Sequence, residues 1–171
     1  MKLLLEGRPG VGKTTVLLKV VKALGSRAGG FITQEVRKGR SRVGFVVRDL
    51  DGREALMAHI SFKGPRVGKY GVSVQAFEEV ALSALREAME KRDLVVIDEI
   101  GKMELLSEAF KGLVLEILGG EKPVLATLSL ARDPFLERVR GMGGVEILRV
   151  TQENRDLLPG RILQRLKEVI G

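Results

Sequence analysis

The stretch that decides the fold is Gly7-Arg8-Pro9-Gly10-Val11-Gly12-Lys13-Thr14, which matches the Walker A pattern GxxxxGK[ST] at every fixed position. Residues 2–5 before it predict a short strand, and residues 13–24 after it carry apolar residues at helical spacing. A glycine-rich turn in this context binds phosphate, because its N–H groups face inward and the helix N-terminus favours negative charge. We expect Lys13 to reach the β- and γ-phosphates of a nucleotide, Thr14 to bind magnesium, and Thr15 to lie beside the α-phosphate.

A second candidate position is the pair Asp98-Glu99, which directly follows the continuous apolar run of residues 94–97. Such a run is typical of a strand buried on both faces. Asp98 then emerges at the C-terminal edge of the sheet, where ligands of open α/β sheets bind, and is expected to hold Mg²⁺ together with Thr14. Glu99 is expected to be catalytic with Lys13, orienting a water or taking its proton. The alternatives are a structural Asp98, and a Glu99 that forms a salt bridge or a helix cap.

Hydroxyl groups follow at the end of the next apolar strand, which we expect at residues 123–128. Thr127 would point between Glu99 and the γ-phosphate and hold the attacking water, and Ser129 follows it. Threonine is also a common strand residue, so a purely structural Thr127 is an equal alternative.

Strands and helices alternate over most of the chain. Strand patterns at residues 94–97, 123–128 and 145–150 are separated by amphipathic helical patterns, and another helix ends the sequence. This alternation predicts an α/β fold with a mostly parallel sheet and helices on both faces. We expect one P-loop NTPase domain over residues 1–171.

The alternation of strands and helices is interrupted by a β-rich basic insertion at about residues 30–73. Residues 30–60 are interpreted as three antiparallel strands, with turns at residues 38–41 and at Asp51-Gly52, and residues 61–73 as a loop. Residues 37–69 hold nine basic against three acidic side chains. This charge favours phosphates of nucleotides or of nucleic acid, or else it is a solvated face on a thermophile-like protein.

Composition excludes several other classes. The 171 residues are 44% hydrophobic and include no cysteine and one histidine, His59. A disulfide scaffold, a thiolate zinc site, a cysteine nucleophile and a histidine-rich metal site are therefore excluded. No apolar run approaches the roughly 18 residues of a membrane span, and no signal peptide is expected. We expect a cytoplasmic monomer without a membrane partner.

Base recognition is assigned to the loop after the last predicted strand, residues 151–155. Asn154 offers a donor and acceptors to a base edge, and the planar guanidinium of Arg155 stacks on any base. Alternatively, Thr151 caps the last helix and Arg155 pairs with Glu153 or Asp156.

Taken together, these stretches resemble the cancer-related nucleoside-triphosphatase family of small P-loop proteins. The resemblance runs nearly end to end and is carried by residues 7–15, 30–37, 42–45, 67–70, 98–105 (DEIGKMEL) and 150–155. It implies slow hydrolysis of ATP, GTP and other nucleoside triphosphates to diphosphates, with broad base preference, and the core of the glutamate-bearing P-loop branch. The loop of residues 129–134 departs from the family pattern in length and sequence, so no substrate contact is assigned to Arg132.

Two other functions remain open. A nucleotide or small-molecule kinase would share the sheet, and Arg132, Arg138 and Arg140 have the composition of a lid. Glu99 beside Asp98 favours hydrolysis instead, because in a kinase a carboxylate positioned to activate water would hydrolyse ATP without phosphorylating the acceptor. A nucleic-acid-stimulated ATPase ranks last. The basic stretch holds Phe45 and Phe62, with Tyr70 just beyond it, for base stacking, yet Phe45 alternates like a core residue.

Overall fold

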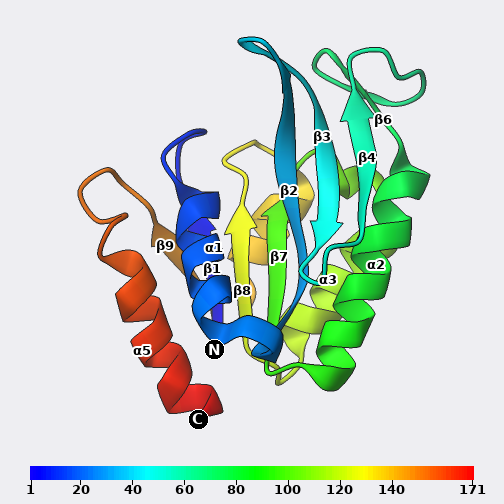
Figure 1. The fold of residues 1–171 in the computed structure, drawn as a ribbon. Coiled ribbons are helices and arrows are strands. Elements are labelled where there is room, and N and C mark those ends of the chain that lie inside the picture. The colour runs from blue at the N-terminus through cyan, green and yellow to red at the C-terminus, as the bar shows by residue number, and fades with distance from the viewer.

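The computed structural model describes residues 1–171, which form a nine-stranded sheet in the order β5-β6-β4-β3-β2-β7-β8-β1-β9, flanked by helices (Figure 1). The strands are β1 (Lys2–Glu6), β2 (Ala28–Lys38), β3 (Ser41–Asp49), β4 (Glu54–His59), β5 (Arg66–Val67), β6 (Tyr70–Val72), β7 (Leu94–Ile100), β8 (Val124–Leu128) and β9 (Val145–Arg149). The helices are α1 (Lys13–Leu24), α2 (Val74–Lys91), α3 (Glu108–Gly119), α4 (Pro134–Arg140) and α5 (Leu158–Ile170), and two 3₁₀ segments lie at Gly25–Arg27 and Glu104–Leu106.

The parallel half of the sheet positions the phosphate loop and the acidic pair. Strands β2, β7, β8, β1 and β9 pair in parallel, and β8 lies between β7 and β1. The C-terminal ends of β1, β7 and β8 therefore meet at one edge, where the Walker A loop leaves β1 and Asp98 lies near the end of β7. The predicted α/β fold with a mostly parallel sheet is confirmed.

The insertion extends this same sheet with antiparallel strands. β3 pairs with β2 and with β4, as the turn signals predict, and the β2–β3 hairpin stands above the edge that carries the phosphate loop (Figure 1). The prediction of a loop over residues 61–73 is wrong in part. β5 and β6 form a short hairpin there, because Tyr70 and Val72 are buried against the core and β6 pairs with β4.

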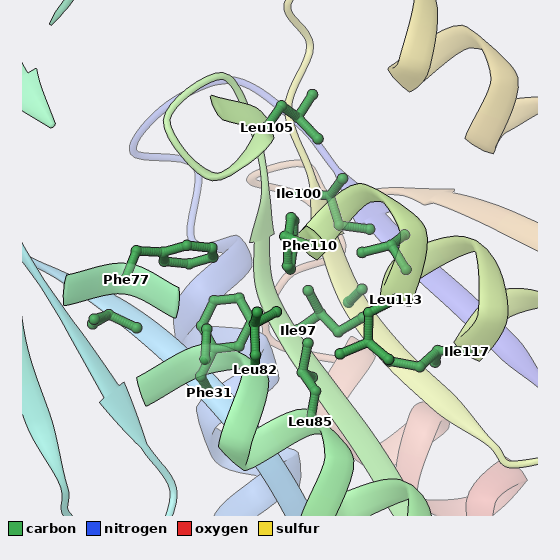
Figure 2. Packing of buried hydrophobic residues seen from close by; sticks show 14 of the residues in the cluster. Phe31, Phe77, Leu82, Leu85, Ile97, Ile100, Leu105, Phe110, Leu113 and Ile117 are labelled. Atoms are coloured by element: carbon green, nitrogen blue, oxygen red, sulfur yellow. The ribbon is translucent and has the colours of Figure 1, made fainter. Parts of the chain in front are cut away.

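Two apolar layers cover the two faces of the sheet. α1 and α5 pack on one face, over alternate residues such as Leu3 and Leu5 of β1. α2, α3 and α4 pack on the other face, where Phe31, Phe77 and Phe110 meet edge to face (Figure 2). Asp133 accepts hydrogen bonds from the first turn of α4, and Ser107 caps α3. None of the helices combines the length and the apolar composition needed to cross a bilayer.

Candidate active site at the phosphate loop

The Walker A loop has the backbone that its glycines permit. Gly10 and Gly12 have φ angles of 80° and 111°, in the left-handed region that side chains rarely tolerate. A hydrogen bond from the Val11 N–H to the Arg8 carbonyl closes the turn of residues 8–11, and α1 starts directly after Gly12. The free N–H groups of the first turn of α1 therefore lie at the loop, which is the arrangement that binds phosphate.

Asp98 connects three elements of the site. The Thr14 hydroxyl lies 3.3 Å from Asp98 Oδ1 and 3.2 Å from Oδ2, and the Thr127 hydroxyl donates to Oδ1 over 2.6 Å. The predicted pairing of Thr14 with Asp98 is thus present. Thr127, in contrast, is fully buried and gives its hydroxyl to Asp98, so the expected direction between Glu99 and the γ-phosphate is not observed. The Ser129 hydroxyl accepts from the Ala131 N–H in the loop after β8.

Burial dominates the electrostatics of this aspartate. With 2% of the residue exposed, burial raises the pKa of Asp98 from its ordinary 3.8 to about 6, and the negative charge of Glu99 adds to the rise. The hydrogen bonds from Thr127 and Thr14 and the charge of Lys13 act in the opposite direction but are smaller.

The Thr14 hydroxyl and the Asp98 carboxylate lie within hydrogen-bond distance of each other, and oxygen ligands of this kind suit Mg²⁺. The structure contains no group of three or more His, Cys, Asp or Glu side chains that would enclose a metal. A site with two protein oxygens fits magnesium well, because this ion usually keeps several waters and takes the rest of its ligands from phosphates.

Lys13 and Glu99 face each other across the loop. Lys13 Nζ lies 3.3 Å from Glu99 Oε2, and the side chains are 11% and 33% exposed. The structure therefore brings Lys13, Thr14, Asp98 and Glu99 together at the edge formed by β1, β7 and β8, although 84 to 86 residues separate the two halves of the site.

Of the two predicted base-binding residues, Arg155 reaches the phosphate loop and Asn154 does not. Arg155 donates from Nη1 to the Val11 carbonyl over 3.1 Å, and it forms no ion pair with Glu153 or Asp156. The Asn154 side chain is engaged within its own loop: its Oδ1 accepts from the Thr151 N–H and its Nδ2 donates to the Arg149 carbonyl. Thr151 accepts from the Asn154 N–H rather than capping α5, which starts seven residues later at Leu158.

Clefts lie on both sides of the loop. On the side of residues 149–156, one cleft of about 560 Å³ is lined by Arg8 and Gln152, and another of about 320 Å³ by Thr15 and Arg155. On the opposite side, a cleft of about 660 Å³ separates Lys13 and Thr14 from the β2–β3 hairpin.

Sequence reasoning missed several groups near the site. Gln34, Arg37 and Arg48 of the hairpin line the largest cleft, and the period-2 alternation from buried Ile32 would have placed Gln34 on that face. Arg140, one of the three arginines whose sequence resembles a lid, is held by Glu6, the last residue of β1, and donates to the Ser129 carbonyl over 2.9 Å. Arg140 is therefore fixed to the sheet edge, unlike a residue of a mobile lid.

Fold and loop together define a P-loop NTPase, in which the phosphate loop follows one strand and the acidic pair lies two strands away in the sheet. Comparison with known proteins identifies the family to which the chain belongs. A family model described as NTPase matches residues 2–163.

Relatives named nucleoside-triphosphatase THEP1 include those of Thermotoga maritima and Thermofilum pendens. They are 44% and 47% identical, and each alignment covers 98% of this chain and 96% of the relative. The crystal structure of THEP1 from Aquifex aeolicus superimposes with a TM-score of 0.90 at 40% identity, covering 98% and 99% of the two chains. The solution structure of a human cancer-related nucleoside triphosphatase gives 0.82 at 36% identity, covering 98% and 97%. The chain belongs to this nucleoside-triphosphatase family.

Proposed function

We propose that the protein is a magnesium-dependent nucleoside-triphosphatase that hydrolyses ATP, GTP and other nucleoside triphosphates to diphosphate and phosphate, slowly and with broad base preference. The observation that carries this proposal is the position of Glu99, whose carboxylate lies 3.3 Å from the loop lysine and one residue beyond Asp98. Family membership supports the same class of reaction.

In this mechanism, the loop N–H groups and Lys13 bind the β- and γ-phosphates and stabilise the negative charge that develops on them. Thr14 and Asp98 would hold Mg²⁺, which supplies further positive charge to the phosphate oxygens when it is bound. Thr127 keeps the Asp98 carboxylate oriented by its 2.6 Å hydrogen bond.

Glu99 acts on the attacking water. The water oxygen forms a bond to the γ-phosphorus while the bond from that phosphorus to the bridging oxygen breaks, and the diphosphate leaves. The water proton passes to Glu99 and then to the released phosphate. A carboxylate that is one-third exposed is accessible to such a water.

Broad base preference is consistent with a loop that has no side-chain amide available to hydrogen-bond a base edge. The Asn154 side chain is hydrogen-bonded to the backbone of its own loop, whereas the Arg155 side chain lies beside Gly12 and Thr15. Contact through a guanidinium plane is tolerant of base identity.

Phosphate release measured without any added acceptor tests the proposal. We expect release from ATP, GTP and CTP that requires magnesium and stops when the metal is chelated. Release that starts only when a nucleoside or another hydroxyl acceptor is added would instead establish a kinase. The cleft of about 660 Å³ beside Thr14 is the one observation that favours this second candidate, because an acceptor would bind there.

A nucleic-acid-stimulated ATPase has less support. Phe45 and Tyr70 pack edge to face with ring centroids 5.2 Å apart, and Tyr70 is 6% exposed, so neither ring is free to stack on a base. Several basic side chains of the insertion, among them Arg37, Arg42 and Arg48, are paired with Glu35 or Glu54.

A further inference from the structure

A second glutamate is buried next to the active site. Glu104 lies in the 3₁₀ segment after β7 and is 5% exposed, and it forms no ion pair. The mechanism above does not use it. No other side chain forms a hydrogen bond with its carboxyl, and the nearby backbone N–H groups of Glu104 and Gly101 lower its pKa by less than burial raises it. A buried acid without a cation is uncommon, because ionisation in such a place is unfavourable.

Glu104 and Glu99 approach the same small space above Gly101. A methyl group added at Gly101 would lie 2.7 Å from Glu99 Oε1 and 2.9 Å from Glu104 Oε1. Only glycine leaves room for both oxygens at this position. The other oxygen of Glu99, Oε2, is the one that lies 3.3 Å from Lys13 Nζ. The two oxygens of Glu99 therefore have different surroundings, one facing Glu104 and one facing the phosphate loop.

When two carboxyl groups share one small space, ionisation of either one disfavours ionisation of the other, and the more deeply buried group loses its proton less readily. Burial, followed by the negative charge of Glu99, raises the pKa of Glu104 well above its ordinary value. A protonated carboxyl has an O–H donor that an ionised one lacks. Glu104 is thus able to act as a hydrogen-bond donor toward Glu99.

Packing gives no separate reason for an acid here. Leu105, the next residue, is buried in the core near Ile100 and holds the segment to the end of β7 (Figure 2). Ser107 caps α3 and donates to Glu78 over 2.6 Å. Because these neighbours already anchor the segment, an apolar residue at position 104 would serve packing equally well.

We propose that Glu104 is the positioning residue for Glu99: as a neutral carboxylic acid it holds the Oε1 side of the Glu99 carboxylate and leaves Oε2 directed toward the phosphate loop. This inference rests on the proposed hydrolysis, in which Glu99 accepts the proton of the attacking water.

Two substitutions of nearly equal volume separate positioning from packing. Glu104→Gln keeps a neutral donor, whereas Glu104→Met keeps the size and removes the donor. We expect Glu104→Met to lower kcat for ATP and GTP about 10- to 100-fold, with KM and Tm close to those of the unmodified protein, because a displaced base acts poorly. Glu104→Gln should stay within about 3-fold of the unmodified kcat. Glu108→Gln, at an exposed carboxylate of α3, is the matched control.

An unchanged kcat in Glu104→Met would overturn the proposal, and so would a Glu104→Gln variant as slow as Glu104→Met. A measurement independent of hydrolysis is the infrared C=O stretch of a protonated carboxyl at about pH 8, where Asp98, with its pKa of about 6, is ionised. We expect this band in the unmodified protein and its loss in Glu104→Gln, and its absence from the unmodified protein would contradict the neutral acid. If the unmodified protein releases no phosphate, the proposed function fails, while the infrared result still reports on Glu104.

Discussion

Lys13 Nζ and Glu99 Oε2 lie 3.3 Å apart, so the first residue of α1 and the end of β7 are joined by an ion pair between the two side chains proposed for catalysis. In the proposed mechanism, the phosphates of a bound nucleotide would compete with Glu99 for the same ammonium group. Binding would then exchange one partner of Lys13 for another and free the Oε2 of Glu99 for the attacking water.

Glu99→Gln removes the charge that competes for Lys13 and also removes the proposed base. We expect kcat to fall at least about 100-fold, since general bases contribute that much or more. Affinity for magnesium nucleotide should be retained or increase about 2- to 5-fold, because a partly exposed ion pair is worth up to about 1 kcal/mol. Nucleotide titration and phosphate release on the same preparation check both values. Equal losses of affinity and rate would mean that Glu99 is structural or binds the metal.

Lys13→Ala should abolish turnover and weaken nucleotide binding, because it removes the cation expected at the transferred phosphate. Electrostatic contacts of this kind are typically worth about 100-fold or more in kcat. Lys22→Ala, at an exposed position in the last turn of α1, is the control for loss of a lysine from the same helix. A Lys13→Ala variant that keeps more than about a tenth of kcat would refute the assignment.

Gly101→Ala tests the shared space above Gly101 from the backbone side. The added methyl would lie 2.7 Å from Glu99 Oε1, so the Glu99 carboxylate must move. We expect kcat to fall about 10-fold or more while nucleotide affinity stays within about 2-fold, because Lys13 and Thr14 are untouched. Gly112→Ala in α3, where a methyl meets no atom within 4 Å, is the matched control. Equal kcat values for the two variants would show that the position of Glu99 tolerates displacement.

Asp98 makes the stability of the metal-free protein depend on pH. Its pKa is about 6 in the folded state against an ordinary 3.8, so the folded state holds this proton more tightly than the unfolded chain. The free energy of unfolding should then fall by about 3 kcal/mol in total as pH rises from about 3 to about 7, most steeply between the two pKa values.

Denaturant unfolding at a series of pH values, with a chelator present, measures this dependence. Asp98→Asn should flatten the curve between about pH 4 and pH 6, and it should raise the magnesium concentration needed for hydrolysis. Glu104 adds a slope of the same sign, which Asp98→Asn leaves in place. A variant with the same pH dependence as the unmodified protein would show that Asp98 does not carry this proton.

Local patterns predicted the parts of the fold and the site that depend on local chemistry. The Walker A loop, the buried strand before Asp98 and the Asp51-Gly52 turn each follow from residue types at fixed spacing. The β5–β6 hairpin was predicted as a loop because glycine and proline, here Gly68 and Pro65, are more common in loops than in strands. The burial of Tyr70, which favours a strand, can be seen only in the folded structure.

Partners distant in sequence were harder to predict. Thr127 donates to Asp98 across 29 residues, and Arg140 binds Glu6 across 134. Each of these polar groups has many chemically equivalent partners in the sequence, and only the order of strands β7, β8 and β1 decides between them. Glu104 lay within a recognised stretch, but its burial beside Glu99 depends on the turn after β7.

We propose that Arg155 contacts the base of the nucleotide. Its Nη1 donates to the Val11 carbonyl over 3.1 Å, and its Cδ lies beside Gly12, so the guanidinium is held against the phosphate loop next to the cleft that Thr15 lines. We expect Arg155→Ala to raise KM for ATP, GTP and CTP by similar factors with little change in kcat, because contact with the face of a base is lost equally in the ground state and the transition state. Arg161→Ala, at an exposed position of α5, controls for the loss of a nearby charge. Steady-state kinetics with the three nucleotides and a thermal melt of each variant provide the test. Unchanged KM values together with a lowered Tm would show that Arg155 only braces the phosphate loop through Val11, and a rise confined to one nucleotide would show that this loop selects among bases.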